Sequence, residues 1–329
     1  MYGQNPPALV DRIVQTIGAT GDEPVADGSG GTTTLHRALT DVYSLNTPSR
    51  RLLELLASRG AADLAPLLER GNAEALKRYV NGWNEAHDVL DVLEEHRGSP
   101  VTAVELVESL RKSLPRLYSI ASSLRAHPRE VHLLVVSVRY TIRGRLREGL
   151  CSTWLADRWP VDATATMYLQ NQQKHFGMPA DDGTPLIMIG PGTGLAPFRA
   201  FVEERRLRGA TGRNWLFFGE QHRATDFFYE RELTSYVRDG LLRLDLAFSR
   251  DQTEKIYVQH RMRVGARDIW AWLEDGGEIY VCGDKERMAA DVDRELHRIV
   301  EAEGGRSPED AKAFVEELKK TKRYKRDVY

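Results

Sequence analysis

The feature that most restricts the fold lies after residue 185, where four short apolar runs each end in small or polar residues. Near-continuous apolar strands that alternate with helices are typical of a parallel sheet covered on both faces. We therefore predict a parallel α/β domain over residues 183–329. The runs are PLIMIG, NWLFFG, RLDLAFS and EIYVCG, and the helical stretches are APFRAFVEERRLRG, TDFFYERELTSYVRDG, DIWAWLEDG and RMAADVDRELHRIVEAEGG.

The ends of these runs mark the expected ligand edge, because open parallel sheets bind ligands beyond the carboxyl ends of their strands. The first end is the turn Gly190-Pro-Gly-Thr-Gly, followed by a helix expected to begin at Ala196. Glycines let the backbone approach a phosphate, and a helix N-terminus adds free N–H groups. The spacing is not GxGxxG, so a tight turn without a ligand is an equal alternative.

A second candidate ligand segment begins at another strand end, Ser249-Arg250, and continues to Gln259. If residues 255–259 are extended, Lys255, Tyr257 and Gln259 project on one face. A cation, a ring and an amide beside an arginine suit a ribose 2′-phosphate and a stacked adenine, because arginine offers phosphate a bidentate fork. Taken alone, the segment is better interpreted as a solvated polar edge.

The first half of the chain has a different character. Apolar residues spaced by three and four predict a helical unit over residues 35–114, while residues 20–33 are rich in Gly, Asp and Thr and are interpreted as a loop. β-Branched and aromatic residues predict strands at 116–123, 131–140 and 165–171.

Composition excludes several classes of protein. The net charge of −2 gives no general attraction to nucleic acid or anionic membranes, and no run reaches the roughly 18 apolar residues of a membrane span. Cys151 and Cys282 are the two cysteines, too few for a disulfide framework or a four-cysteine metal site. We predict no metal centre, and a reducing cytoplasm is the simplest location.

Several motifs together resemble the NADPH–FAD reductase module, of the ferredoxin–NADP reductase type, found in diflavin reductases, and within them the sulfite reductase branch. They are GPGTGLAPFRAFVEER, FSRDQTEKIYVQ, IYVCGD and the ending KRYKRDVY, and they occur in the family's order. The similarity runs from about residue 4 to the last residue. It implies an incomplete N-terminal part of an FAD domain at 1–34, a helical connecting subdomain at 35–114, a partial antiparallel FAD barrel at 115–182 and a Rossmann-like NADP(H) domain at 183–329.

The resemblance also implies the flavin contacts. Arg116 would neutralise the FAD pyrophosphate, Tyr118 would pack on the isoalloxazine, and Ser119 would offer its hydroxyl near flavin N5. Without the family context, Tyr118 and Ser119 belong to an ordinary alternating strand. The full set of implied FAD contacts is Arg116, Leu117, Tyr118, Ser119, Leu134, Val135, Val136, Tyr140, Gly149, Leu150, Cys151 and Ser152.

For the nicotinamide side, the resemblance places Cys282 beside C4, with Asp327 near Ser119 and Cys282. Tyr329 would stack on the flavin and move aside to admit NADPH, and these four residues form the implied catalytic set. A lone cysteine in an apolar strand is otherwise usually a small buried hydrophobe. The implied NADP(H) contacts are Gly192, Thr193, Ser249, Arg250, Lys255, Ile256, Tyr257, Val258, Gln259, Asp291 and Tyr329.

The implied function is hydride transfer from NADPH to FAD. Electrons would pass to a flavodoxin-like FMN domain or a sulfite reductase hemoprotein, with FMN expected only on a separate domain or protein. The family's flavodoxin domain and first barrel strands have no counterpart in the sequence, so either Met1 is internal to a longer protein or another chain supplies strands. Two alternatives stay open: an NADP-binding module without stable FAD, and an NADH enzyme that uses Glu220.

Overall fold

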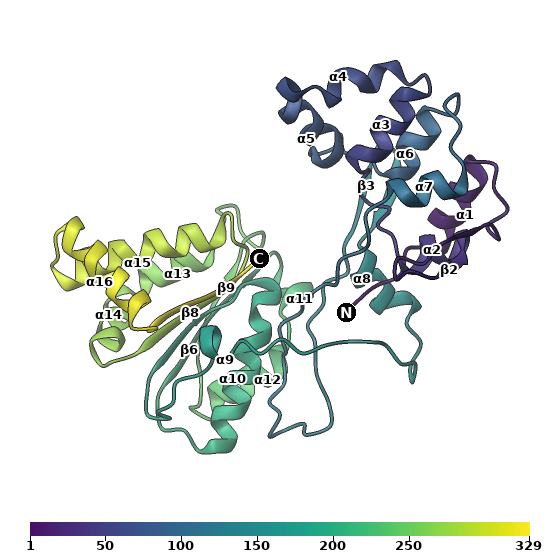
Figure 1. Cartoon of the computed structure of the whole chain (residues 1–329). Helices are drawn as coiled ribbons and strands as arrows, with labels where there is room; N and C mark the ends of the chain where they lie inside the picture. The colour runs from purple at the N-terminus through teal and green to yellow at the C-terminus, as the bar shows by residue number, and fades with distance from the viewer. The chain divides into compact units, whose positions relative to one another are not determined.

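The computed structural model describes residues 1–329 and divides them into two compact units (Figure 1). The first, here called the helical unit, comprises residues 1–117 and 136–169. The second, the sheet unit, comprises residues 118–135 and 170–329. The chain therefore passes from one unit to the other three times, and the predicted division into four consecutive domains stays a prediction.

The sheet unit contains the predicted parallel sheet. Its five strands follow the order β7-β6-β5-β8-β9, and every neighbouring pair is parallel. The four apolar runs form four of the strands as predicted, whereas the C-terminal strand was missed because three consecutive charged residues, Lys325, Arg326 and Asp327, occupy its centre. The strands are β5 (Leu186–Ile189), β6 (Asn214–Glu220), β7 (Arg243–Phe248), β8 (Glu278–Gly283) and β9 (Tyr324–Val328).

Helices cover both faces of this sheet, which explains why its central strands are apolar throughout. Successive side chains of a strand point to opposite faces, and accordingly Ile187 and Ile189 enter one buried core while Leu186 and Met188 enter the other. The helices are α9 (Gln173–Phe176), α10 (Leu195–Arg208), α11 (Arg223–Asp226), α12 (Glu230–Arg238), α13 (Val258–Val264), α14 (Ala266–Glu274), α15 (Met288–Gly304) and α16 (Pro308–Lys320).

The helical unit packs its amphipathic helices around one core that includes Leu39, Leu52 and Leu93. The predicted helical pattern over residues 35–114 is confirmed, and α1 was not predicted. The helices are α1 (Pro7–Thr16), α2 (Leu35–Asp41), α3 (Arg50–Ser58), α4 (Ala65–Leu68), α5 (Ala73–Asn81), α6 (Val89–Glu95), α7 (Ala103–Ser109) and α8 (Leu150–Thr153), with short 3₁₀ turns at Ala62–Leu64 and Arg70–Asn72 and a π turn at Trp154–Arg158.

The segment interpreted as a loop at residues 20–33 contains a small hairpin instead. β1 (Pro24–Ala26) pairs with β2 (Thr32–Thr34), and the turn between them is closed by Asp27, whose carboxylate accepts the backbone N–H groups of Ser29 and Gly31. The Asp and Gly residues that suggested a loop are therefore the residues of the turn.

The barrel strands predicted in the middle of the chain are largely absent. Residues 116–123 form a single bridge, between Ile120 and Leu133, and residues 165–171 form no ladder. β3 (Arg139–Ile142) and β4 (Arg145–Glu148) form a hairpin that overlaps the end of the 131–140 prediction. A strand needs a neighbouring strand for its backbone hydrogen bonds, and these segments have none over most of their length.

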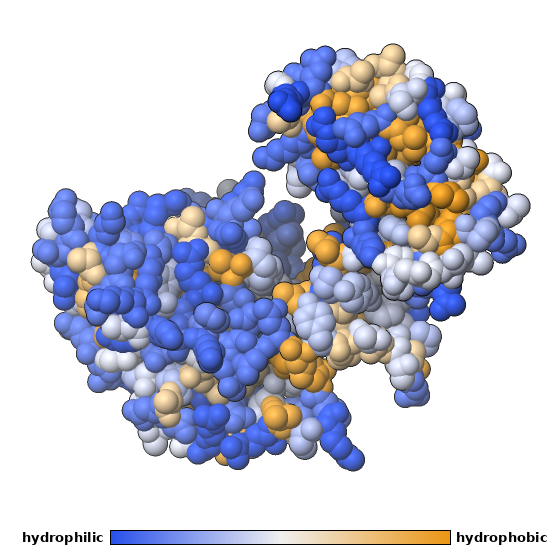
Figure 2. All heavy atoms as spheres, in the orientation of Figure 1, coloured by the Kyte–Doolittle hydropathy of each residue, from blue (hydrophilic) through white to orange (hydrophobic).

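Apolar side chains in these segments are correspondingly exposed: Leu117 is 62% exposed and Leu169 is 73% exposed. The visible face of the sheet unit is mainly hydrophilic, whereas the helical unit shows larger hydrophobic areas (Figure 2). None of the helices combines the length and apolar content needed to cross a membrane. The fold class is nevertheless the one predicted, an α/β chain with a parallel sheet and small antiparallel sheets.

Candidate functional site

The glycine-rich turn after β5 lies directly against the end of β8. Gly192–Gly194 form a 3₁₀ turn, and α10 begins at Leu195, one residue before the predicted start. A Cβ atom on Gly194 would lie 2.1 Å from the carbonyl oxygen of Cys282, so no other residue fits without moving one of the two backbones. This close approach brings the turn and the end of β8 together.

Three of the predicted catalytic residues meet at this edge of the sheet. Cys282 and Asp327 are paired in the parallel register of β8 and β9. The Ser119 hydroxyl donates to Oδ2 of Asp327 over 3.2 Å, and it also hydrogen-bonds the Cys282 thiol. Residues 208 positions apart in the chain therefore form one group of a hydroxyl, a thiol and a carboxylate. We call these three residues the strand-end cluster.

The thiol in the strand-end cluster is held in its neutral form. Cys282 is fully buried, and this burial raises its pKa to about 12, with a further increase from the nearby Asp327 carboxylate and a small decrease from Ser119. Desolvation disfavours the charged form of any acid. The Cys282 thiol is therefore suited to contact an apolar or neutral group, and it is not an activated nucleophile.

The C-terminal residue is tied to the glycine-rich turn. The Tyr329 hydroxyl lies 2.8 Å from Oγ1 of Thr193, and the Tyr329 backbone N–H donates to the Gly283 carbonyl over 3.1 Å. The side chain is 64% exposed all the same. An aromatic ring anchored at its backbone and hydroxyl but open to solvent on its faces can stack on a planar ligand and can also be displaced.

Two charged residues of α10 that the sequence analysis did not select hold residues 118–135 within the sheet unit. The Arg199 guanidinium donates to the Ala121 carbonyl over 2.5 Å, and the Glu203 carboxylate accepts the Ser123 N–H over 2.7 Å. Both side chains are buried. Their sequence signal was two charged residues, an arginine and a glutamate four residues apart, on an otherwise apolar helix face.

A second group of candidate residues, which includes Glu220, Ser249 and Arg250, lies at the ends of β6 and β7. The Ser249 backbone N–H donates to the Glu220 carbonyl over 2.8 Å, which joins the two strand ends, and burial raises the pKa of the Glu220 carboxyl, with Arg250 opposing the increase. The exposed side chains of Arg250 and Lys255 form neither a hydrogen bond nor an ion pair with the chain. The Asp251 carboxylate is already bonded to the Arg223 N–H. Two cations are thus free to bind an anion.

The conformation predicted for residues 255–259 is wrong. The segment turns into α13 at Val258, so Gln259 lies in a helix and does not share an extended face with Lys255 and Tyr257. The Gln259 amide donates to Oδ2 of Asp291 over 3.1 Å, which joins two of the residues implied by the family resemblance. Ile256 is partly buried against the sheet core and Tyr257 is exposed. The helical conformation is favoured over the extended one because Val258 and Met262, four residues apart, both enter that core.

In the helical unit, the second predicted phosphate loop is a tight turn into a helix. The Gly149 N–H donates to the Val138 carbonyl over 2.9 Å, and α8 begins at Leu150. A Cβ on Gly149 would lie 2.5 Å from the Ser152 hydroxyl oxygen, so this turn also requires glycine. Cys151 is buried. The backbone N–H groups of such a turn are suited to an anion.

The other predicted flavin residues are divided between the two units. Arg116, Leu117, Val136 and Tyr140 belong to the helical unit, where all four side chains are exposed and Arg116 has no side-chain partner. Tyr118, Leu134 and Val135 belong to the sheet unit, where Leu134 packs against a core.

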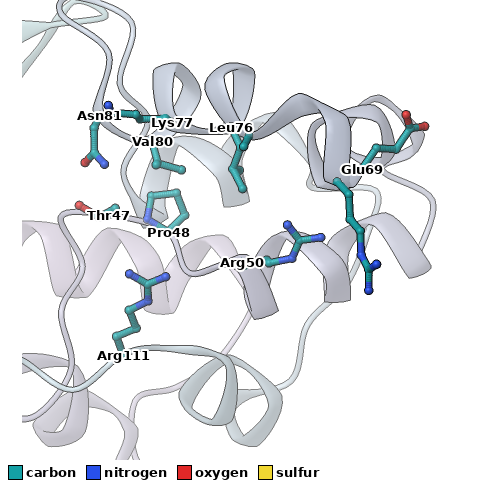
Figure 3. Close-up of a pocket in the computed structure, with 11 residues that line it drawn as sticks. Thr47, Pro48, Arg50, Glu69, Leu76, Lys77, Val80, Asn81 and Arg111 are labelled. Carbon is teal, nitrogen blue, oxygen red and sulfur yellow. The ribbon is translucent and has the colours of Figure 1, made fainter.

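An open pocket of about 310 Å³ lies elsewhere in the helical unit and contains none of the predicted residues (Figure 3). Its apolar lining includes Leu76 and Val80 of α5, and the Arg50 guanidinium at its side donates to Glu54. The strand-end cluster is the stronger candidate because it combines unlike functional groups at the carboxyl edge of the parallel sheet.

Comparison with known protein families agrees with this arrangement. Residues 1–154 match the FAD binding domain family, and residues 188–294 match the oxidoreductase NAD-binding domain family. The chain thus belongs to the class of two-domain flavoprotein oxidoreductases, with an FAD-binding domain followed by an NAD(P)-binding domain.

Over its whole length the chain is similar to the sulfite reductase [NADPH] flavoprotein alpha-component. It is 43% identical over 332 residues to that protein from Bacillus subtilis (strain 168), covering 100% of this chain and 54% of the relative. The protein of the same name from Salmonella typhi is 43% identical over 333 residues, with 100% and 54% covered. The chain spans about half the length of these relatives. The predicted family and the predicted cofactor classes, FAD and NADP(H), are confirmed.

Proposed function

We propose that this chain transfers a hydride from NADPH to FAD and serves as the reductase half of an electron-transfer flavoprotein. The observation that carries the proposal is the strand-end cluster, in which Ser119, Cys282 and Asp327 meet at the carboxyl edge of the parallel sheet. FAD, when bound, supplies a ring that takes two electrons from a nicotinamide and gives them up one at a time.

The chain's own residues fit both cofactors. Gly149 and Gly194 each sit where a Cβ would collide with neighbouring atoms, which is the property of turns that bring backbone N–H groups close to a phosphate. The exposed Arg116 guanidinium has no partner in the chain and is suited to neutralise a pyrophosphate. Tyr329 offers an exposed ring.

Within the strand-end cluster, each group has a distinct role. The Ser119 hydroxyl is oriented by its hydrogen bond to Asp327, so its position is fixed before any ligand arrives. The neutral Cys282 thiol presents a polarizable, uncharged surface to the nicotinamide ring. The Asp327 carboxylate favours the positive charge that a nicotinamide gains as it loses a hydride. Tyr329 would cover the flavin until NADPH displaces it, a gating step.

We assign the selection of NADPH over NADH to the two cations without an ion pair, Arg250 and Lys255. Arg250 and Lys255 can bind a 2′-phosphate, while Ser249 and Tyr257 lie on the same stretch of chain. Glu220 could instead accept a ribose 2′-hydroxyl, but its Oε2 already accepts the Gln221 N–H over 2.8 Å and it lies beside the Arg250 cation. We therefore assign NADPH as the substrate.

The acceptor of the electrons is proposed from the relatives, whose name is that of a sulfite reductase component. A flavodoxin-like FMN domain or a sulfite reductase hemoprotein would receive electrons from FAD, in assimilatory sulfite reduction. The four-part domain division of the sequence analysis is kept as part of this proposal.

Steady-state reduction of ferricyanide tests the proposal. The FAD-reconstituted chain should reduce ferricyanide with NADPH, and Ser119→Ala and Cys282→Ala should lower kcat while leaving the affinity for NADPH nearly unchanged. No NADPH-dependent reduction by a chain that retains FAD would contradict the proposal. An equal loss of NADPH affinity would contradict the assignment of Ser119 and Cys282.

One observation supports a second candidate, an NADP-binding module that does not hold FAD stably. The segments that bear most predicted flavin contacts form few strand ladders, and several of their apolar residues are exposed. A colourless purified chain that binds 2′,5′-ADP but retains no FAD after reconstitution would favour this candidate over the first.

A further inference from the structure

A turn in the sheet unit brings two imidazole rings and a carboxylate together away from the strand-end cluster. His127, Glu130 and His132 each offer one ligand atom, and these three atoms lie within 4.8 Å of one another. The two imidazole centroids are 4.2 Å apart. Oε2 of Glu130 lies 3.0 Å from Nε2 of His132 and 3.8 Å from Nδ1 of His127.

These distances match the geometry of a small metal centre. Around a tetrahedral zinc ion with bonds of about 2.0–2.1 Å, neighbouring ligand atoms lie about 3.3 Å apart. The two distances from Oε2 of Glu130 lie on either side of that value, and the two imidazole nitrogens lie within 4.8 Å of each other. Side-chain rotations that draw these two nitrogens together would complete the site. Two imidazoles with one carboxylate favour Zn²⁺ over Ca²⁺ or Mg²⁺, which prefer sites made of oxygen.

A buried carboxylate behind one ring supports this interpretation independently. Nε2 of His127 lies 2.9 Å from Oε1 of Glu203, whose side chain is 7% exposed. A histidine that ligates a metal through one ring nitrogen usually donates its other N–H to a carboxylate, which fixes the tautomer and the ring orientation. With its Nε2–H donated to Glu203, His127 directs the lone pair of Nδ1 toward Glu130.

Metal binding through the His132 ring would break a hydrogen bond, which lowers the affinity of the site for zinc. Nδ1 of His132 lies 3.3 Å from Nη1 of Arg199 and accepts a hydrogen bond when Nε2 carries the proton. Binding a metal through Nε2 moves that proton to Nδ1 and breaks this contact. Arg199 keeps its bonds to Ala121 and Glu232. We therefore expect a weaker affinity for zinc than that of a site in which both rings are already oriented for the metal.

From this arrangement we propose that His127, Glu130 and His132 form a Zn²⁺ site with a fourth position open to water. The site closes the turn of a short hairpin in which the Ala121 N–H donates to the His132 carbonyl and Ile120 bridges Leu133. Zinc would stabilise this hairpin, whose chain leads back to Ser119. The proposal does not depend on the proposed function.

Isothermal titration of the tag-free full chain with zinc chloride tests the site. We expect one zinc ion per chain, with binding lost in His127→Ala, His132→Ala and Glu130→Gln. Glu203→Gln should weaken binding about 10–100-fold, because a neutral amide orients His127 less strongly. In hydrogen exchange, zinc should slow the Ala121 amide in the wild type and leave it unchanged in Glu130→Gln.

His36→Ala is the matched control, because His36 also pairs with one carboxylate, Asp11, but has no second imidazole nearby. It should bind zinc like the wild type. Glu130 is 67% exposed at its side chain, so Glu130→Gln tests the site without threatening the fold. Absence of binding, or binding unchanged in both Glu130→Gln and His132→Ala, would overturn the proposal.

Discussion

At the scale of single residues, the sheet unit holds a buried neutral group in one place and exposed charged groups in another. Cys282 is buried and neutral in the strand-end cluster, while Arg250 and Lys255 are exposed and charged at the end of β7 and in the segment that follows. The sequence showed each residue type but not its environment. The contact between Ser119 and Asp327 in particular was expected from family resemblance alone, because no local pattern connects residues so far apart in the chain.

Replacement of Arg250 or Lys255 by alanine should weaken NADPH binding by about 1–3 kcal/mol each and leave NADH binding unchanged, because only NADPH carries the 2′-phosphate. KM values for the two cofactors measure the effect. Arg231→Ala removes another exposed cation without a partner, on α12, and should change neither KM. An equal loss of affinity for NADH would show that these residues do not recognise the 2′-phosphate.

Tyr329→Ala should improve the use of NADH relative to NADPH. Less binding energy is then needed to displace the ring, whose hydroxyl contacts Thr193 in the structure. The ratio of kcat/KM for the two cofactors is the measurement, and Tyr329→Phe, which keeps the ring, should behave nearly like the wild type. An unchanged ratio in Tyr329→Ala would refute the gating role.

The Cys282 thiol should resist alkylation by iodoacetamide at pH 8 in the folded chain and react once the chain is unfolded, because its folded pKa is raised to about 12. A raised folded pKa means that the unfolded thiol loses its proton first, so this residue's contribution to stability falls as pH rises above the ordinary cysteine pKa. Peptide mass mapping locates the label, and rapid labelling of native Cys282 would contradict the assigned environment.

At the scale of elements, the parallel strands were predictable and the barrel strands were not. β5, β6 and β8 are buried on both faces, so their apolar runs carried the signal directly. β9 has charged residues at three consecutive positions, 325–327, and α13 begins in a segment whose spacing also fits a strand. The 116–123 and 165–171 segments have strand-like composition, but composition cannot show whether a neighbouring strand is present.

The glycine-rich turn provides a test of the packing between elements. Gly194→Ala places a methyl group 2.1 Å from the Cys282 carbonyl, so the turn or β8 must move. We expect a loss of stability of about 1–3 kcal/mol, as in other overpacked sites, together with weaker NADPH binding. Gly183→Ala, whose nearest neighbours are carboxylate atoms of the flexible Asp181 side chain, is the control. Thermal unfolding of both variants gives the comparison, and equal stability would contradict the close approach.

At the scale of the whole molecule, the chain consists of two compact units that share predicted flavin residues, while the predicted NADP(H) contacts all lie in the sheet unit. The family matches follow the same order, with the FAD binding domain first and the oxidoreductase NAD-binding domain second. Nicotinamide binding should therefore depend on the sheet unit alone. Our central proposal is that NADPH bound by this unit reduces FAD bound by the chain.

The most direct test is the absorption spectrum of the FAD-loaded, desalted chain during anaerobic addition of NADPH. We predict that the flavin band near 450 nm (an approximate value for oxidised flavins) bleaches rapidly with NADPH and much more slowly with an equal concentration of NADH. A chain that retains FAD but whose flavin band is unchanged by NADPH would contradict the account.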